Sequence, residues 1–238
     1  MSQLFLAQIR KKLRDLASPA RRRILTSFFK CGPGEYGEGD EFLGITVPQV
    51  RQLIPLGCSL SLYDLRQMLS SRFHEERMLA LLIVIENFQM ENDAGKKKYF
   101  DFYLQNRSAA NNWDLVDLTA YKVVGVYLEK RPKALLFKLA KSKNLWDRRI
   151  AIVSTLQFIR NENLKPTFAL VDILINDSED LMHKACGWML REAGKKDQKA
   201  LEKFLKIYAH KMPRTMLRYA IEKFPESKRQ FYLKNSRV

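Results

Sequence analysis

Apolar positions recur at helical spacing along most of the chain. Near the start, Leu4, Ile9, Leu13 and Leu16 lie close to the period that places side chains on one face of an α-helix. The run from Met78 to Ile85 is apolar throughout, and the polar residues on both sides extend it past the length of a strand. We therefore predict a buried helix there. No two alternating runs flank a tight Asn-Gly or Asp-Gly turn, so a sheet is not expected.

Capping residues and prolines predict where further helices begin. Ser18 is suited to cap a helix whose first residue is Pro19, because the missing N–H of proline costs nothing in a first turn. Similar signals start at Thr46, Ser61, Arg131, Lys165 and Met212. Given average helix lengths, we expect about twelve to fourteen helices and essentially no strand.

The glycine-rich stretch CGPGEYGEGDEFLG, 31–44, interrupts this pattern and holds five of the ten glycines. A phosphate-binding loop is one interpretation, but no Gly-Lys-Ser/Thr follows, and Glu35, Glu38 and Asp40 would repel phosphate. We predict a long surface loop between the second and third helices. Because long loops in compact domains often carry function, contact with a ligand is a further interpretation.

The second half of the chain repeats. Trp113 and Trp146 are 33 residues apart in similar Asn-x-Trp-Asp helix starts, and Lys184 and Arg218 are 34 apart. Amphipathic helices are expected between such segments, at 132–141, 164–175 and 197–209. This period predicts an all-α protein: a single domain, 1–238, in which HEAT-like helix pairs form an α-solenoid, a curved superhelix with a basic concave face.

The charge of the chain is far from balanced. A net charge of +16, from 42 Lys and Arg against 26 Asp and Glu, favours a polyanionic partner. Nucleic acid is the first candidate, an anionic membrane surface the second, and a purely solubilising charge the alternative that needs no partner. No run of about 18 apolar residues predicts a membrane span.

Three cysteines without C-x-x-C spacing argue against a disulfide framework and a zinc knuckle, and favour a reducing compartment. We expect a cytoplasmic protein, associated with the nucleoid when it is bound to DNA. The amphipathic start resembles a transit peptide in part, but the first helix of the fold is the interpretation we favour.

Candidate binding residues recur on the first helices of the predicted pairs. Trp113 and Asp117 are four residues apart and so share a helix face. Cations at the repeat spacing would follow a duplex backbone, each neutralising a phosphate. These cations are Arg148, Arg149, Lys184, Arg191, Arg214 and Arg218, with Trp188 between two of them.

Each of these residues also has a purely structural interpretation. A Trp at a repeat position often packs in the core, and Asp114 and Asp147 suit the first turns of helices as caps or dipole partners. Asp117 lies one turn deeper, in an apolar segment without a cation at i+4, and is either a functional carboxylate or a buried polar anchor. The histidines at 74, 183 and 210 lack metal-ligand spacing, so surface or hydrogen-bonded roles are expected.

Four segments together resemble a known family. NNWDLVDLTA (111–120), LWDRRIAIVSTL (145–156), ACGWMLREAG (185–194) and RTMLRYAIEKF (214–224) are similar to the AlkD-like DNA alkylation-repair glycosylases, and the likeness runs from FLGITVP at 42–48 to the end of the chain. The resemblance implies a HEAT-like superhelix with duplex DNA in its groove. It also implies hydrolysis of the N-glycosidic bond of N3- or N7-alkylated purines, without a metal or organic cofactor.

Residue by residue, the resemblance makes Asp117 the catalytic carboxylate and pairs Trp113 with Trp188 against the deoxyribose. It makes Arg149 the phosphate-contacting arginine, with Arg148 as the alternative. The glycine-rich stretch departs from the best-matched catalytic members. Three functions therefore remain open: an alkylpurine DNA glycosylase, a non-catalytic binder of DNA structure, and a protein-interaction scaffold. Duplex DNA with alkylated bases is the expected partner, and a monomer the default state.

Overall fold

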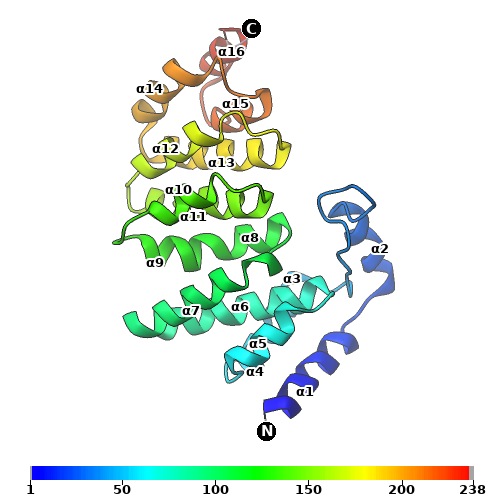
Figure 1. Ribbon diagram of the computed structural model, residues 1–238. Helices are drawn as coiled ribbons and strands as arrows, with labels where there is room; N and C mark the ends of the chain where they lie inside the picture. The colour runs from blue at the N-terminus through cyan, green and yellow to red at the C-terminus, as the bar shows by residue number, and fades with distance from the viewer. Residues whose placement is uncertain (1, 236–238) are drawn as a thin grey trace. The chain divides into compact units, whose positions relative to one another are not determined.

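A computed structural model of the protein describes residues 2–235, which are helical almost throughout (Figure 1). The helices are α1 (Ser2–Asp15), α2 (Pro19–Phe28), α3 (Val47–Arg51), α4 (Ile54–Gly57), α5 (Leu62–Leu69), α6 (His74–Met90), α7 (Asp93–Gln105), η1 (Arg107–Ala109), α8 (Trp113–Ala120), η2 (Tyr121–Gly125), α9 (Val126–Leu128), α10 (Ala134–Leu139), α11 (Leu145–Arg160), α12 (Lys165–Leu174), α13 (Asp180–Lys196), α14 (Gln198–Tyr208), α15 (Arg214–Ala220) and α16 (Glu226–Asn235). Of these, η1 is a 3₁₀ turn and η2 a π-helical segment.

The all-α prediction is confirmed, although the number of helices is higher than expected. Over residues 2–235 there are sixteen α-helical segments and no strand, with one isolated bridge between Glu41 and Phe73. Part of the excess comes from α3 and α4, which are short helices that each carry a proline in the first turn. Because Pro55 has no N–H to donate, α3 cannot continue through it.

The chain forms two compact units, Met1–Leu115 and Val116–Val238. In the first, α6 is the central helix, and α1, α3, α4, α5 and α7 pack on it. The run from Met78 to Ile85 is buried as predicted. In α1 the buried face consists of Leu6, Ile9 and Leu13, whereas Leu4 lies on the solvent side.

The glycine-rich stretch is not a surface loop over its whole length. Its end is buried: Asp40 is 5% and Phe42 1% exposed. Glu75, in the first turn of α6, fixes this end by accepting hydrogen bonds from three successive backbone amides, those of Leu43 (2.8 Å), Gly44 (2.8 Å) and Ile45 (3.1 Å). The prediction of a surface loop holds for Glu35 and Glu38, which are exposed, and is wrong for Asp40, whose carboxylate is buried and bound by internal partners.

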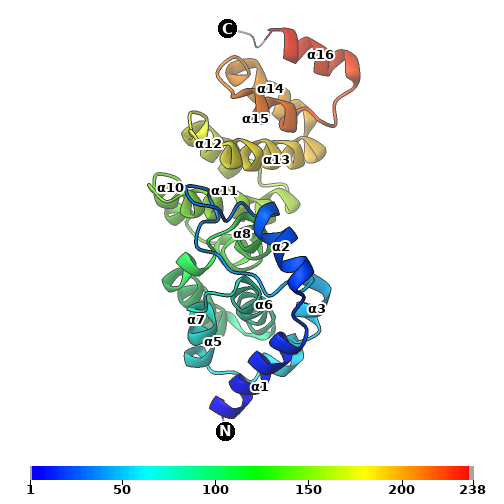
Figure 2. The same ribbon diagram turned by 90° about the vertical axis from the view of Figure 1, so that its right-hand side faces the viewer.

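In the second unit alternate helices pack on one another. The η2 segment, which continues α8, packs on α11, α11 packs on α13, and α13 packs on α15. The helices between them, α10, α12 and α14, correspond to the predicted amphipathic helices at 132–141, 164–175 and 197–209. Figure 2 shows α10 beside α11 and α12 beside α13, as their contacts require. No helix among residues 2–235 is both long enough and apolar enough to cross a bilayer.

Candidate nucleic-acid interface

The predicted catalytic carboxylate, Asp117 on α8, is held by Arg149 on α11. The guanidinium group binds it in a bidentate manner, with Nε donating to Oδ1 and Nη2 to Oδ2, both at 2.8 Å. The remaining Nη1 donates to the carbonyl of Leu181 on α13 at 2.6 Å. Arg149 thus joins three helices that follow one another in the packing of the second unit.

This ion pair supplies the cationic partner that the sequence around Asp117 does not contain. The Arg149 side chain is 6% exposed, and that of Asp117 is 19% exposed. The carboxylate is therefore partly exposed to solvent, while the guanidinium is almost enclosed. A bidentate pair fixes the orientation of the carboxylate as well as its charge. Since Arg149 follows Asp117 by 32 residues, local spacing could not reveal the pair.

Arg148, the alternative phosphate-binding residue, makes a second bidentate pair. Its Nε and Nη2 donate to Asp177 at 2.6 and 3.1 Å, and its Nη1 donates to the carbonyls of Ser142 and Lys143. The Arg148 side chain is 14% exposed. These contacts tie the start of α11 to the segment between α12 and α13.

The other predicted phosphate-binding cations lie nearer the surface. Lys184 pairs with Asp180 one turn earlier on α13, and Arg191 pairs with Glu192 and with Glu222. On α15, Arg214 is exposed and donates to the carbonyl of Leu233 at 2.6 Å, while Arg218 is exposed. The helices that carry the candidate residues, α8 with its continuation η2, then α11, α13 and α15, pack one on the next.

The two predicted indole groups are both half-buried. Trp188 lies on α13, the helix whose Leu181 carbonyl accepts the third hydrogen bond of Arg149. Trp113 is the first residue of α8, and its ring stacks on Phe29 at 5.3 Å and meets the edge of Phe28 at 5.9 Å. Trp113 is thus neither a fully buried core residue nor a freely exposed ring.

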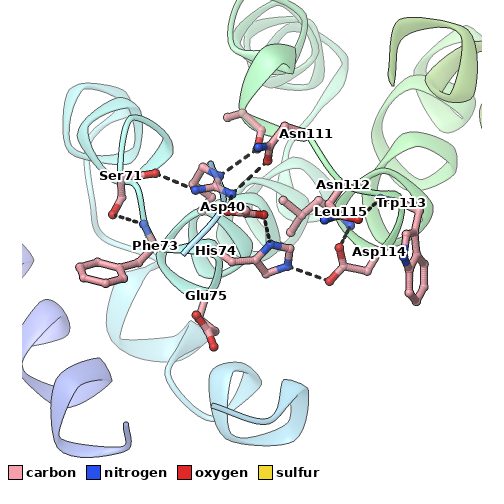
Figure 3. A network of polar contacts seen from close by, with 12 residues as sticks. Asp40, Ser71, Phe73, His74, Glu75, Asn111, Asn112, Trp113, Asp114 and Leu115 are labelled. Carbon is pink, nitrogen blue, oxygen red and sulfur yellow. Dashed lines mark hydrogen bonds and ion pairs between the residues drawn. The ribbon is translucent and has the colours of Figure 1, made fainter. Parts of the chain in front are cut away.

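A buried polar network lies directly beside Trp113 (Figure 3). His74 at the start of α6 is 1% exposed, and both ring nitrogens bind carboxylates: Nδ1 binds Asp40 and Nε2 binds Asp114, each at 2.8 Å. Burial alone would lower the pKa of His74, but the two carboxylates outweigh it and raise that pKa to about 9. At neutral pH the ring is therefore an imidazolium that donates to both acids.

Asp40 also binds Arg77 on α6, and Arg77 reaches Asn111 at 3.0 Å and the carbonyl of Ala109 at 3.2 Å. Burial raises the pKa of Asp40, yet His74 and Arg77 together hold it below its usual value. The network thus connects the end of the glycine-rich stretch with α6 and with the residues that lead into α8.

Sequence reasoning missed this network. It assigned His74 a surface or hydrogen-bonded role, and the structure shows the second. It treated Asp114 as a helix cap, and its Oδ1 does accept from the amide of Leu115 at 2.8 Å while Oδ2 serves His74. The sequence did hold one signal, a histidine followed by two acids at the start of an otherwise apolar helix. If such a helix is buried, its ionisable residues are buried with it, and buried ionisable residues require partners.

The fold and these contacts define an all-α protein in which acidic and basic side chains form ion pairs between neighbouring helices. The model of the family described as DNA alkylation repair enzyme matches residues 9–224. The chain belongs to this family, and DNA is the substrate that the family name implies.

Solved structures support the fold. The chain is similar to a structure described as a predicted DNA alkylation repair enzyme from Enterococcus faecalis, with a TM-score of 0.66 and 17% sequence identity. The likeness covers 88% of this chain and 97% of that one. A comparison with curated protein sequences found no match.

Proposed function

We propose that this protein is a DNA glycosylase that hydrolyses the N-glycosidic bond of N3- or N7-alkylated purines in duplex DNA. The observation that carries the proposal is the oriented carboxylate of Asp117, which is held by Arg149 and is partly exposed to solvent. Membership of the DNA alkylation repair enzyme family supports the same assignment.

The chemistry needs little more than a fixed negative charge. An N-alkylated purine is already cationic and leaves readily, so positive charge develops on the sugar as the bond stretches. The Asp117 carboxylate would stabilise that charge and orient the attacking water, because a charge placed in advance costs no reorganisation in the transition state. The indole faces of Trp113 and Trp188 would each favour a cationic deoxyribose. Neither a metal nor an organic cofactor is required.

Arg149 would serve two anions in turn. In the structure its guanidinium neutralises Asp117, and a DNA phosphate approaching α11 would compete for the same donors. Transfer of Nη2 from the carboxylate to a phosphate would leave the negative charge of Asp117 less neutralised next to the sugar. The hydrogen bond from Nη1 to Leu181 would keep the arginine in place meanwhile.

The binding surface in this proposal is the basic concave face of a HEAT-like superhelix formed by one domain, 1–238. Lys184, Arg214 and Arg218 are the cations best placed to contact phosphates, since they are the more exposed of the set. Arg191 would join them by leaving its acidic partners. We further propose a cytoplasmic monomer that is associated with the nucleoid when it is bound to DNA.

One observation favours a second candidate, a non-catalytic binder of DNA structure. Asp117 is neutralised by a bidentate arginine, which is also what a buried structural anchor would look like. Such a protein would use the same cations to recognise bent or branched DNA and would release no base.

The discriminating experiment is a base-release assay on alkylated duplex DNA. The full chain is incubated with N-methylated duplex, and free N7-methylguanine and N3-methyladenine are measured under single-turnover conditions. Release well above the rate without enzyme supports the glycosylase. Tight, salt-dependent binding without release supports the structural binder, and no binding to any duplex contradicts both.

A further inference from the structure

His74 is linked to the first residues of α8 by a hydrogen-bonded chain. Its Nε2 donates to Asp114, the residue directly after Trp113, and its Nδ1 donates to Asp40 (Figure 3). Because the imidazolium holds both acids at 2.8 Å, the position of Asp114 depends on that of Asp40. The backbone that carries the Trp113 side chain is thus tied to the glycine-rich stretch.

A column of rings connects the same places independently. The His74 ring stacks on Phe42 with centroids 4.5 Å apart, Phe42 stacks on Phe29 at 5.1 Å, and Phe29 stacks on Trp113 at 5.3 Å. The interplanar angles are 24°, 14° and 28°, so each ring lies nearly flat on the next. Flat contacts of this kind restrain the tilt of the indole ring.

The glycine-rich stretch contributes one residue to the hydrogen-bonded chain and one to the column of rings. It brings in Asp40 for the hydrogen-bonded chain and Phe42 for the column. At its centre, the Gly37 amide donates to the carbonyl of Lys30 at 2.9 Å, and a Cβ at Gly37 would collide with the carbonyl of Phe29. Only glycine allows this approach, so the turn 31–44 is held against the end of α2 by a contact that other residues would prevent.

We infer that His74, together with Asp40 and Phe42, is a positioning residue that sets the place and tilt of the Trp113 indole ring. The function of the glycine-rich stretch is then to build this support, and not to touch a phosphate. The consequence for reaction rests on the proposed function, in which Trp113 packs on the deoxyribose. The placement of the ring itself does not depend on it.

The placement is tested by ¹⁹F NMR of the full chain labelled with 5-fluorotryptophan. The three tryptophans, at 113, 146 and 188, give three resonances, and that of Trp113 is identified by its loss in Trp113→Phe. We expect Asp40→Asn and His74→Gln to shift or broaden this resonance, below the melting temperature of each variant. The other two resonances belong to the second unit and should stay in place.

Glu76→Gln is the matched control. Glu76 is a buried acid on the same helix, two residues from His74, and it binds Arg10 at 2.5 Å and Ser71 at 2.9 Å, neither of which belongs to the ring column. Its replacement should lower stability and leave the Trp113 resonance unchanged. Should His74→Gln fail to fold, Asp40→Asn and Phe42→Leu each interrupt one of the two links alone.

The activity arm separates this inference from the proposed function. If the wild type releases alkylated bases, His74→Gln should slow single-turnover release by about tenfold or more with similar duplex affinity, because misplacing a contact group by about 1 Å has large effects on rate. A Trp113 resonance that stays in place in Asp40→Asn, His74→Gln and Phe42→Leu, or moves equally in Glu76→Gln, overturns the inference. Absence of base release by the wild type overturns only the proposed function.

Discussion

At the scale of single residues, the pairing of Asp117 with Arg149 makes its role measurable. In Asp117→Asn the shape is kept and the charge is lost, so we expect single-turnover base release to fall roughly a hundredfold or more, with duplex affinity near normal. The free energy of unfolding should also fall, by about 1–3 kcal/mol. Arg149 keeps its hydrogen bond to the Leu181 carbonyl but loses the charged acceptor that Asp117 provides. Rate, affinity and urea denaturation are measured on the same preparation.

The chain contains its own control for this experiment. Asp177 accepts the same bidentate pattern from Arg148 and is more deeply buried. Asp177→Asn should therefore cost at least as much stability and leave base release per folded molecule unchanged. If the two variants lose release in proportion to their loss of stability, Asp117 is an anchor and the catalytic assignment is wrong.

His74 predicts a particular dependence of stability on pH. Its pKa rises from 6.5 to about 9 on folding, so the native state binds its proton more tightly. The stabilisation is complete below pH 6.5 and is lost as the pH rises through about 9. The difference in free energy of unfolding between wild type and His74→Gln should accordingly shrink between neutral and alkaline pH. A difference that is constant or grows would contradict a doubly bonded imidazolium.

At the scale of elements, the turn into α3 depends on a backbone conformation and on space. Gly44 has φ +86°, and a Cβ there would collide with the carbonyl of Ser18. Gly39 has a similar φ of +81° but open space around it. We expect Gly39→Ala to cost about 1 kcal/mol through its backbone alone, and Gly44→Ala roughly 2–4 kcal/mol, since overpacking adds to the strain. Equal losses in chemical denaturation would show that the close approach to Ser18 is unimportant.

At the scale of the whole molecule, the net charge of +16 affects which partners the protein attracts, and says little about the fold. The Lys184 side chain is 42% exposed and its pair with Asp180 lies within one helix, so breaking this ion pair costs little. Lys184→Ala should weaken binding to all duplexes similarly and lower the slope of log K against log salt by about one unit. Titrations at several salt concentrations measure this slope.

Two further variants test whether the change in slope depends on where the cation lies. Lys199→Ala removes an exposed lysine of α14, a helix outside the series that carries the candidate residues, and should leave the slope unchanged. Arg148→Ala should lower stability without reducing the slope by a full unit, because its guanidinium is occupied by Asp177. If all three variants lower the slope equally, charge alone drives binding and no particular face is used.

The sequence alone determined the features that depend on short separations along the chain. Helix starts at Ser18, Ser61 and Lys165 follow from capping and proline chemistry, which act within one turn. The burial of α6 follows from its continuous apolar run. The family followed from four short segments, each of which lies within or beside one helix.

Only the tertiary structure decided which charges meet. Asp117 finds Arg149 across 32 residues, and His74 joins Asp40 to Asp114 across 34 and 40. No local rule distinguishes these residues from solvated neighbours such as Glu38, because an ionisable side chain looks the same in a sequence whether water or protein solvates it. The cost of burying a charge without a partner selects these pairs, and that cost arises only once the helices have packed.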